Sequence, residues 1–288
     1  MKYNSINSII NPLKFLIPDK IYLRLQFRKH LREKLNLKTP KTFNEKIQWL
    51  KLYDRKPEYI KYVDKYSVRE YIKETIGEKY LIPLIGVYDN VEDIEWEKLP
   101  SKFVLKCTHG SHCNIICTDK SDLDIKDAKK KLETWMKRNW YWYGREWPYK
   151  DVKPRIVCEK FMLDESGVEL KDYKIFCFNG EPKMIEVDYN RFNGLTKNLY
   201  DINWMYIPVS FNRSTEPNKT IEKPKRLDDM LQLASRLAKN YPFVRIDFYS
   251  IGTEIYFGEI TFYPISGFGN IQPKEFDYKW GSWINLNK

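Results

Sequence analysis

The 288-residue sequence has no apolar run that approaches the roughly 20 residues needed by a membrane-spanning helix. It also lacks low-complexity tracts and evident repeats, which argues against disordered and solenoid classes. Its first residues lack the apolar core and small-residue cleavage site of a signal peptide. Cysteines are few and odd in number, at five, so a disulfide framework is not expected. These absences predict a globular, cytoplasmic protein with reduced thiols.

Positive charge is concentrated near the beginning of the chain. The net charge is +11, and residues 1–50 contain eleven Lys or Arg against three Asp or Glu. Residues 11–38 mix these bases with Leu, Ile and Phe. This mixture predicts either a basic amphipathic helix on an anionic membrane surface, hence peripheral membrane contact, or a helix packed on the protein body with its lysines in water. We expect no nucleic-acid partner, because no recognition motif accompanies the charge.

The first half of the chain predicts helices followed by a strand–loop–strand unit. Thr42 and Glu45 form a capping-box pattern, so a helix is expected to begin there, and a second helix is expected over residues 64–77. Two short strands are expected on either side of the loop Cys107–Cys113, which contains Thr, Gly and Ser. Backbone N–H groups of such a loop can bind phosphate oxygens, so the loop is a candidate flap over a nucleotide.

The same loop permits a second interpretation, a zinc site. Thiol and imidazole groups gather here, namely Cys107, His109, His112, Cys113 and Cys117. Their spacing differs from the C-x₂₋₄-C and H-x₃₋₅-H pairs of zinc modules. The spacing therefore favours small buried cysteines over metal ligands.

The second half of the chain predicts a hinge, a hairpin and an amphipathic helix. A strand over residues 155–162 runs into a polar turn that could join two lobes. Asn179-Gly180 predicts the turn of a hairpin over residues 171–191, and residues 226–241 have helical periodicity. Within the hairpin, Glu186 and Asp188 resemble the carboxylate pair with which glycosyltransferases hold a metal and a sugar nucleotide.

A further hairpin near the C-terminus carries alternating polar residues, with its turn at Gly252. A two-residue turn would place Glu259 on the face opposite Asp247, whereas a three-residue loop or a bulge places Arg245, Asp247, Glu259 and Thr261 on one face. Two carboxylates and an arginine can bind a divalent cation and an anion together. The alternative is a solvated face with an Arg–Glu cross-strand pair.

Taken together, these segments resemble the TupA-like branch of the ATP-grasp superfamily over roughly residues 40–285. The likeness is carried by Asp64-Lys65 with Arg69, Phe103–Ser111, Asn114–Cys117, Glu159–Phe161, Asp172–Gly180, Val244–Asp247 and Tyr256–Pro264. It implies an α+β fold in which two α+β lobes with antiparallel sheets grip ATP, preceded by an N-terminal helical region. The expected bounds are 1–98 for the helical region, 99–162 for the small lobe and 163–288 for the C-terminal lobe.

The resemblance implies ATP-binding roles for residues of the first two regions. Lys65 and Lys106 would reach the phosphates or adenine, and the backbone of Lys160 and Met162, with Glu159, would contact adenine. The flap residues would be His109, Gly110 and Ser111. At position 112 this chain has His where related loops usually have Gly, and a histidine is bulkier and stiffer than glycine.

The resemblance also implies the catalytic residues. Lys174 would contact the γ-phosphate, and Arg245 would stabilise charge on the transferring phosphoryl group. Asp247, Glu259 and Thr261 would ligate Mg²⁺. Thr261 stands where the superfamily often has Asn, and its hydroxyl can still ligate Mg²⁺ or a bound water.

ATP-grasp enzymes typically phosphorylate a carboxylate, and an amine then attacks the acyl phosphate. The TupA-like branch resembles proteins of capsule, exopolysaccharide or teichuronopeptide synthesis. The resemblance therefore implies a ligase that joins an amino acid or amine to an acidic sugar of a polysaccharide precursor. The alternatives are a glycosyltransferase using Glu186 and Asp188, a non-catalytic glycan-binding or membrane-adaptor protein, and a kinase-like member.

Overall fold

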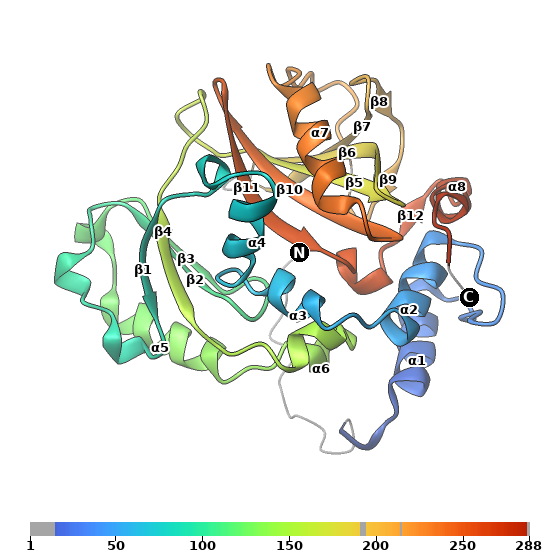
Figure 1. The fold of residues 1–288 in the computed structure, drawn as a ribbon, viewed down its shortest axis with the longest axis horizontal. Helices are drawn as coiled ribbons and strands as arrows, with labels where there is room; N and C mark the ends of the chain where they lie inside the picture. Colours follow the sequence, from blue (N-terminus) through green and yellow to red (C-terminus); the bar gives the residue numbers. More distant parts are fainter. Residues whose placement is uncertain (1–14, 191–193, 214, 287–288) are drawn as a thin grey trace.

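A computed structural model describes residues 15–190, 194–213 and 215–286 (Figure 1). Two separate sheets organise the chain, and N-terminal helices precede them. One sheet has four strands in the order β1-β4-β2-β3, and the other has six in the order β11-β10-β5-β6-β7-β8. Neighbouring strands in both sheets pair antiparallel, as the hairpin signals predicted.

The N-terminal helices are α1 (Asp19–Leu31), α2 (Phe43–Tyr53), α3 (Glu58–Val63) and α4 (Val68–Thr75). The predicted capping box is confirmed at the start of α2. Thr42 Oγ1 accepts from the Glu45 N–H at 3.2 Å, and Glu45 Oε2 accepts from the Thr42 N–H at 3.1 Å. The helix expected from residue 64 begins later, because the Asp64 carboxylate accepts hydrogen bonds from the N–H of Tyr66 and the hydroxyl of Ser67 and holds a turn there.

The small lobe contains β1 (Leu84–Tyr88), β2 (Phe103–Cys107), β3 (Asn114–Cys117), β4 (Ile156–Lys160) and α5 (Ile125–Met136), whereas α6 (Tyr141–Gly144) packs through Tyr141 against the core of the other lobe. The small lobe's own apolar core includes Phe103, Leu105 and Leu132. Strand β1 lies before the expected boundary at residue 98, yet it pairs with β4 as an edge strand of this sheet. We therefore propose that the small lobe begins at β1.

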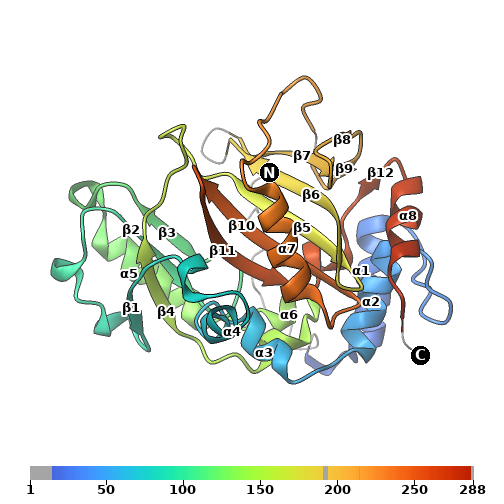
Figure 2. The same ribbon diagram turned by 45° about the horizontal axis from the view of Figure 1, so that its top comes forward.

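The C-terminal lobe contains β5 (Asp172–Phe178), β6 (Glu181–Tyr189), β7 (Thr196–Asp201), β8 (Tyr206–Ile207), α7 (Leu227–Ala238), β10 (Phe243–Ile251) and β11 (Glu254–Thr261). Asn179 and Gly180 have φ of 49° and 85°, which confirms the predicted two-residue turn between β5 and β6. Helix α7 lies along β10, β5 and β6 and covers one face of the sheet (Figure 2). The opposite face carries the polar residues described below.

A short sheet and the N-terminal helices complete the C-terminal lobe. Strands β9 (Ser210–Phe211) and β12 (Ile271–Gln272) pair beside α8 (Glu275–Trp283). The Phe43 ring of α2 lies 5.0 Å from that of Phe243 and 5.9 Å from that of Trp280. Helix α2 therefore shares the apolar core of the C-terminal lobe, and the helical region is not an independent unit.

A fully buried lysine fixes the segment that follows β11. Lys51 Nζ donates to the carbonyl of Gly144 at 2.8 Å and to that of Ser266 at 2.6 Å. Ile265, Ser266 and Gly267 are three consecutive residues with φ of 50–62°. Two of them are not glycine, so this backbone is held by its surroundings.

Stability should depend on pH through Lys51. Burial lowers its pKa to about 7, against the opposing effect of Glu146. Because the folded pKa lies below the unfolded value of 10.5, the unfolded state binds more protons between pH 7 and 10.5, and stability should rise with pH there. The contribution is at most about 1.4 kcal/mol per pH unit. In urea unfolding at pH 7, 8 and 9, Lys51→Met should lack this rise and exposed Lys126→Met should keep it. Parallel profiles for the wild type and Lys51→Met would contradict the assignment.

Candidate active site

The hairpin of β10 and β11 reaches its functional register through a bulge. Ile251 pairs with Glu254, so the turn has two residues, and the three-residue loop considered above is wrong. The register then shifts, because Phe248 pairs with Phe257 while Asp247 pairs with Glu259. Gly258 is the extra residue. A Cβ at this position would lie 3.1 Å from the Asp247 carbonyl oxygen, which favours glycine.

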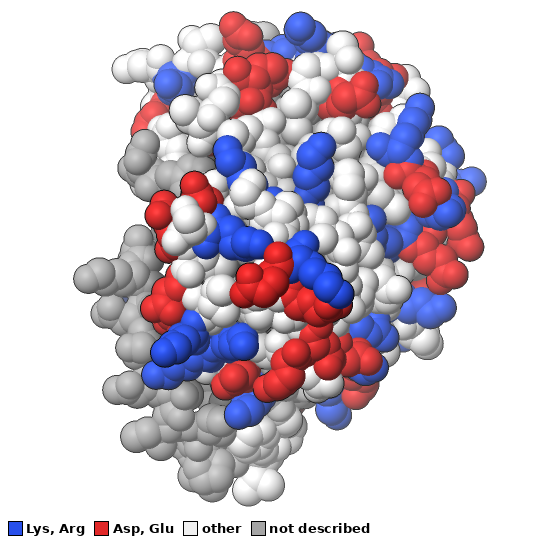
Figure 3. Space-filling view, turned by 90° about the vertical axis from the view of Figure 1, so that its left-hand side faces the viewer, with Lys and Arg blue, Asp and Glu red and all other residues white. Residues whose placement is uncertain are grey.

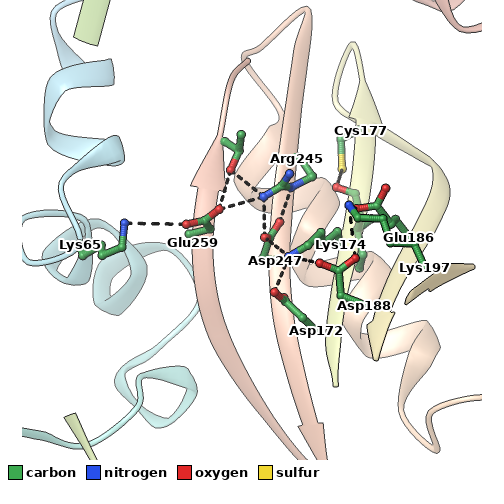
Figure 4. Close-up of polar contacts among 12 residues, drawn as sticks. Lys65, Asp172, Lys174, Cys177, Glu186, Asp188, Lys197, Arg245, Asp247 and Glu259 are labelled. Carbon is green, nitrogen blue, oxygen red and sulfur yellow. Dashed lines mark hydrogen bonds and ion pairs between the residues drawn. The ribbon is translucent and has the colours of Figure 1, made fainter. Parts of the chain in front are cut away.

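Three oxygen-bearing side chains converge on one guanidinium nitrogen (Figure 4). Arg245 Nη2 lies 2.7 Å from Asp247 Oδ2, 2.8 Å from Glu259 Oε1 and 3.0 Å from Thr261 Oγ1. Arg245 Nε also donates to Asp247 Oδ1 at 2.7 Å. The bulge therefore brings all four residues of the expected catalytic face together.

The charged cluster continues onto β5 and β6. Lys174 pairs with Asp247 across the strands, and its Nζ donates to Asp247 Oδ2 at 2.9 Å and to Asp172. The same nitrogen lies 3.7 Å from Asp188 Oδ2. Since Lys174 is nearly inaccessible to solvent, each of these carboxylates is held by a desolvated cation.

The pKa values of this cluster follow from burial and neighbouring charge. Burial raises the pKa of Asp247 to about 6, although Arg245 and Lys174 oppose it. Burial also acts to raise the pKa of Glu259, but Lys65 and Arg245 outweigh it and lower the pKa to about 2. For Lys174, Asp172 and Asp247 outweigh burial and hold the pKa well above its usual value. At neutral pH the face therefore presents ionised carboxylates beside ionised bases.

Lys65 connects this face to the candidate flap. It lies between α3 and α4, and its Nζ donates to the Gly110 carbonyl at 2.8 Å and lies 3.9 Å from Glu259 Oε2. Its N–H donates to the Thr108 carbonyl at 3.3 Å. Figure 4 shows the Lys65 side chain extending toward Glu259 of β11 from the segment between α3 and α4. Lys65 thus links the loop at Gly110 to the hairpin at Glu259.

The residues expected near adenine are already engaged with one another. Lys106 Nζ lies 2.6 Å from Glu159 Oε2, and Arg69 Nη1 lies 3.5 Å from Glu159 Oε1. The N–H of Lys160 donates to the Pro83 carbonyl at 3.0 Å. Met162 is half-buried just beyond the end of β4, and its backbone stays a candidate for the adenine contact. Direct contact of the Glu159 carboxylate with adenine would require its ion pairs to open.

The loop between β2 and β3 combines a packed histidine with an unusual backbone. His109 is 4% exposed, and its Nε2 lies 3.2 Å from the Trp135 carbonyl of α5, so its side chain packs against that helix. His112 has φ of 59°, a conformation that favours glycine. The histidine at this position thus holds a left-handed backbone conformation that glycine adopts without strain. Gly110 and Ser111 stay candidates for phosphate contact.

The hairpin, and not the cysteines, offers the candidate ligands for a metal ion. Among the described residues, no group of three or more His, Cys, Asp or Glu side chains could hold a metal ion. The five cysteines are free and buried, which gives the zinc interpretation no support. Mg²⁺ is commonly held by one or two carboxylates completed by water and substrate phosphates. Asp247 and Glu259 supply two carboxylates and Thr261 a hydroxyl close together, so these three residues are the candidate ligands, and Arg245 Nη2 occupies the point on which their oxygens converge.

Two charged residues of the cluster, Asp172 and Lys197, were not predicted as site residues from the sequence. Asp172 lies two positions before Lys174 on the same strand face, and that spacing was an available signal. Lys197 contacts Glu186 at 2.5 Å and Asp188 at 3.4 Å, but it belongs to β7, and no local pattern announces that contact.

No helix in the described part of the chain is long and apolar enough to cross a membrane.

Comparison with known proteins gives a family and a set of similar folds. Curated proteins gave no match. Among solved structures, the chain is similar to D-alanine–D-alanine ligase from Helicobacter pylori, with a TM-score of 0.43 and 14% identity over 84% of this chain and 69% of that one. The ligase of the same name from Bacillus anthracis, complexed with ATP, gives 0.41 and 16% over 70% and 55%. N5-carboxyaminoimidazole ribonucleotide synthetase from Thermus thermophilus gives 0.40 and 12% over 84% and 52%. The chain thus spans between about half and two thirds of these proteins.

A match to a protein-family model shows the family of this chain. The family described as TupA-like ATP-grasp matches residues 45–285, which is most of the chain. The match confirms the expected α+β ATP-grasp fold and the expected class of enzyme. This chain belongs to the TupA-like ATP-grasp family.

Proposed function

We propose that this protein is an ATP- and Mg²⁺-dependent carboxylate–amine ligase that joins an amino acid or amine to an acidic sugar of a cell-surface polysaccharide precursor. The observation that carries the ATP-dependent step is the convergence of Arg245, Asp247, Glu259 and Thr261, with Lys174 beside them. The polysaccharide substrate rests on analogy with the TupA-like branch. We expect the reaction to occur in the cytoplasm, where ATP is available.

In the first step, a carboxylate oxygen of the sugar acid attacks the γ-phosphorus of ATP. The bond between that phosphorus and the β–γ bridging oxygen breaks, ADP leaves, and an acyl phosphate forms. Lys174 and Arg245 supply fixed positive charge beside the transferring group. Asp247, Glu259 and Thr261 would hold Mg²⁺. When bound, Mg²⁺ would neutralise negative charge on the phosphates during the transfer.

In the second step, the amine nitrogen attacks the acyl carbon. The nitrogen loses a proton, the bond from carbon to the phosphate oxygen breaks, and inorganic phosphate leaves. The oxyanion of the tetrahedral intermediate needs a fixed cation, and Arg245 is suited to this role because its charge persists at any working pH. The flap residues Gly110 and Ser111, which Lys65 ties to the hairpin, would cover the phosphates.

The glycosyltransferase alternative gains no support from its own residues. Glu186 is 1% exposed, and both Glu186 and Asp188 contact Lys197. Burial raises the pKa of Glu186, against the effect of Lys197, which does not suit a metal ligand. The antiparallel sheet also differs from the βαβ series expected of a sugar-nucleotide domain.

A phosphate-release screen tests the proposed reaction. The full chain would be incubated with Mg-ATP, panels of sugar acids and panels of amino acids, with products identified by mass. We expect release of phosphate only when an acid and an amine are both present, and a product equal to acid plus amine minus water. Hydroxylamine should replace the amine and give a hydroxamate.

Other outcomes of the same screen contradict the proposal in distinct ways. Transfer of phosphate to a hydroxyl group without dependence on amine would indicate a kinase. Stabilisation by sugar nucleotides, together with indifference to ATP, would indicate a glycosyltransferase. Glycan binding without ATP turnover would indicate a binding protein.

A further inference from the structure

Helix α1 is fixed to the protein body by one face. Tyr22, Leu23 and Phe27 are buried and form a small apolar core with Leu35 and Phe268. This confirms neither of the two interpretations of residues 11–38 by itself, because a helix can be docked on one side and bind a partner on the other. Residues 11–14 of that segment lie outside the described part of the chain.

The opposite side of α1 exposes large apolar side chains. Leu16 is 77% exposed, Ile21 is 51% exposed and Leu25 is 56% exposed. Ile21 and Leu25 are one turn apart, so they lie one above the other on the helix surface, with Leu16 just before the helix. We call these three residues the apolar strip. Single exposed apolar residues are ordinary, but Ile21 and Leu25 are neighbours on the helix and Leu16 is exposed in the segment that leads into it, so the three form a candidate surface for interaction.

A row of bases accompanies the apolar strip. Basic residues recur at four-residue spacing along the helix, at Lys20, Arg24 and Arg28. Each lies beside the apolar strip or beside the extension of that strip along the helix. Lys29 and Arg32 follow them. All five are exposed. Within the described residues, none of the five forms an ion pair.

The nearby carboxylates are already engaged and do not neutralise these bases. Asp19 accepts a hydrogen bond from Arg55 at 2.9 Å and another from Tyr141 at 2.5 Å. Glu33 accepts from Lys274 at 2.9 Å. The exposed side of α1 therefore presents uncompensated positive charge directly beside apolar side chains.

A second basic surface, on helix α5, lacks this combination. Helix α5 exposes Lys126, Lys129 and Lys130, but Asp127 and Glu133 lie among them, and no large apolar side chain is exposed on that helix. Figure 3, which looks at the side of the molecule where the small lobe lies, shows Lys and Arg interspersed with Asp and Glu. Helix α5 thus provides a matched control for charge alone.

We propose that the exposed side of α1 docks on an anionic lipid bilayer. The apolar strip enters the boundary between headgroups and acyl chains, and the five bases contact lipid phosphates. A soluble anionic polymer would require the bases but would gain nothing from exposed Leu16, Ile21 and Leu25, so the strip favours a lipid surface. The docking is reversible, since three apolar side chains and a few charges hold far less tightly than a spanning helix. It does not depend on which substrate the ATP site uses.

Partitioning of the full chain on vesicles tests the docking surface. Vesicles of phosphatidylcholine with phosphatidylglycerol would be compared with pure phosphatidylcholine, using sedimentation at about 0.1 M salt. We expect binding only to the anionic vesicles. Arg24→Glu with Arg28→Glu should reduce the partition coefficient roughly 30-fold or more. Leu16→Ser with Ile21→Ser and Leu25→Ser should reduce it at least about tenfold.

The matched control is Lys126→Glu with Lys129→Glu on α5, which makes the same change in net charge and should stay within about twofold of the wild type. All variants should keep the same stabilisation by Mg-ATP, which shows that each is folded. Deletion of residues 1–38 is unsuitable, because it would also remove Tyr22, Leu23 and Phe27 and uncover Phe268.

Three results would overturn the proposal. One is an equal loss of binding in the α5 control, which would show attraction by net charge alone. Another is unchanged binding when the apolar strip is replaced, which would favour a soluble anionic polymer. The third is no binding of the wild type to anionic vesicles.

Discussion

Replacing Glu259 with Gln is expected to reduce turnover of Mg-ATP by about 10²- to 10³-fold. The substitution keeps the shape of the side chain but removes one of the two negative charges that converge beside Arg245. The amide oxygen can still accept from Arg245 and Thr261, and the side chain is 36% exposed. Because Lys65 and Arg245 hold the ionised carboxylate in the folded state, the free energy of unfolding should fall by about 1–2 kcal/mol at neutral pH, which leaves the protein folded.

Phosphate release and thermal stabilisation by Mg-ATP are the two measurements for Glu259→Gln. Both should fall together, because both depend on the metal-bound nucleotide. Glu254→Gln is the matched control, since Glu254 is exposed at the tip of the same strand and should behave as the wild type. Normal turnover by Glu259→Gln would place the metal site elsewhere.

Replacing Lys174 with Met should have the largest effect on stability. Its ammonium group is buried among Asp172, Asp247 and Asp188. Removing one partner of a buried ion network leaves uncompensated charges, so the free energy of unfolding should fall by about 3–5 kcal/mol. Turnover should also be lost, because the proposed contact with the γ-phosphate goes with it.

A double-mutant cycle separates charge compensation from loss of packing. If uncompensated charge causes the loss, adding Asp172→Asn to Lys174→Met should restore about 1 kcal/mol or more. Lys183→Met, which breaks the surface pair of Lys183 with Glu181, should cost less than about 1 kcal/mol. Strictly additive effects in urea unfolding would show that Asp172 and Lys174 are not coupled.

Elements with a local signal were predictable from the sequence. The capping box at Thr42 and the turn at Asn179-Gly180 each depend on a few adjacent residues, and both are found as expected. The polar alternation of the last hairpin also identified four residues that the structure brings into contact. Local hydrogen bonding and side-chain periodicity suffice for such features.

The bulge in the last hairpin could have been located from the sequence as well. Ile255 and Phe257 are buried, whereas Glu259 and Thr261 face the polar side, yet all four are odd-numbered. Side chains alternate strictly between the two faces of a regular strand. Ile255 and Phe257 therefore cannot lie on one face and Glu259 and Thr261 on the other unless an extra residue interrupts the alternation. Gly258 is the one residue between them. A three-residue loop would turn Ile255 and Phe257 toward the polar face. These two apolar side chains therefore exclude that loop.

The remaining contacts depend on how distant elements pack, and no local pattern encodes them. Glu186 is paired with Lys197 only because β6 and β7 adopt one register. The His109 side chain is buried only because α5 lies over the loop. Lys65 reaches Gly110 and Glu259 from a turn far from both in sequence. Sequence spacing identified candidate residues, but their actual partners required the assembled lobes.

The position of the bulge has a consequence for how this hairpin can change length during evolution. Loss of Gly258 would leave Asp247 opposite Glu259 and Phe248 opposite Phe257, because the extra residue takes no part in either pair. A single deletion between Glu254 and Phe257 would instead turn an apolar side chain toward the ion cluster or turn Glu259 away from it. Homologous hairpins should therefore gain or lose a single residue at the bulge, and elsewhere on this strand only two residues at a time.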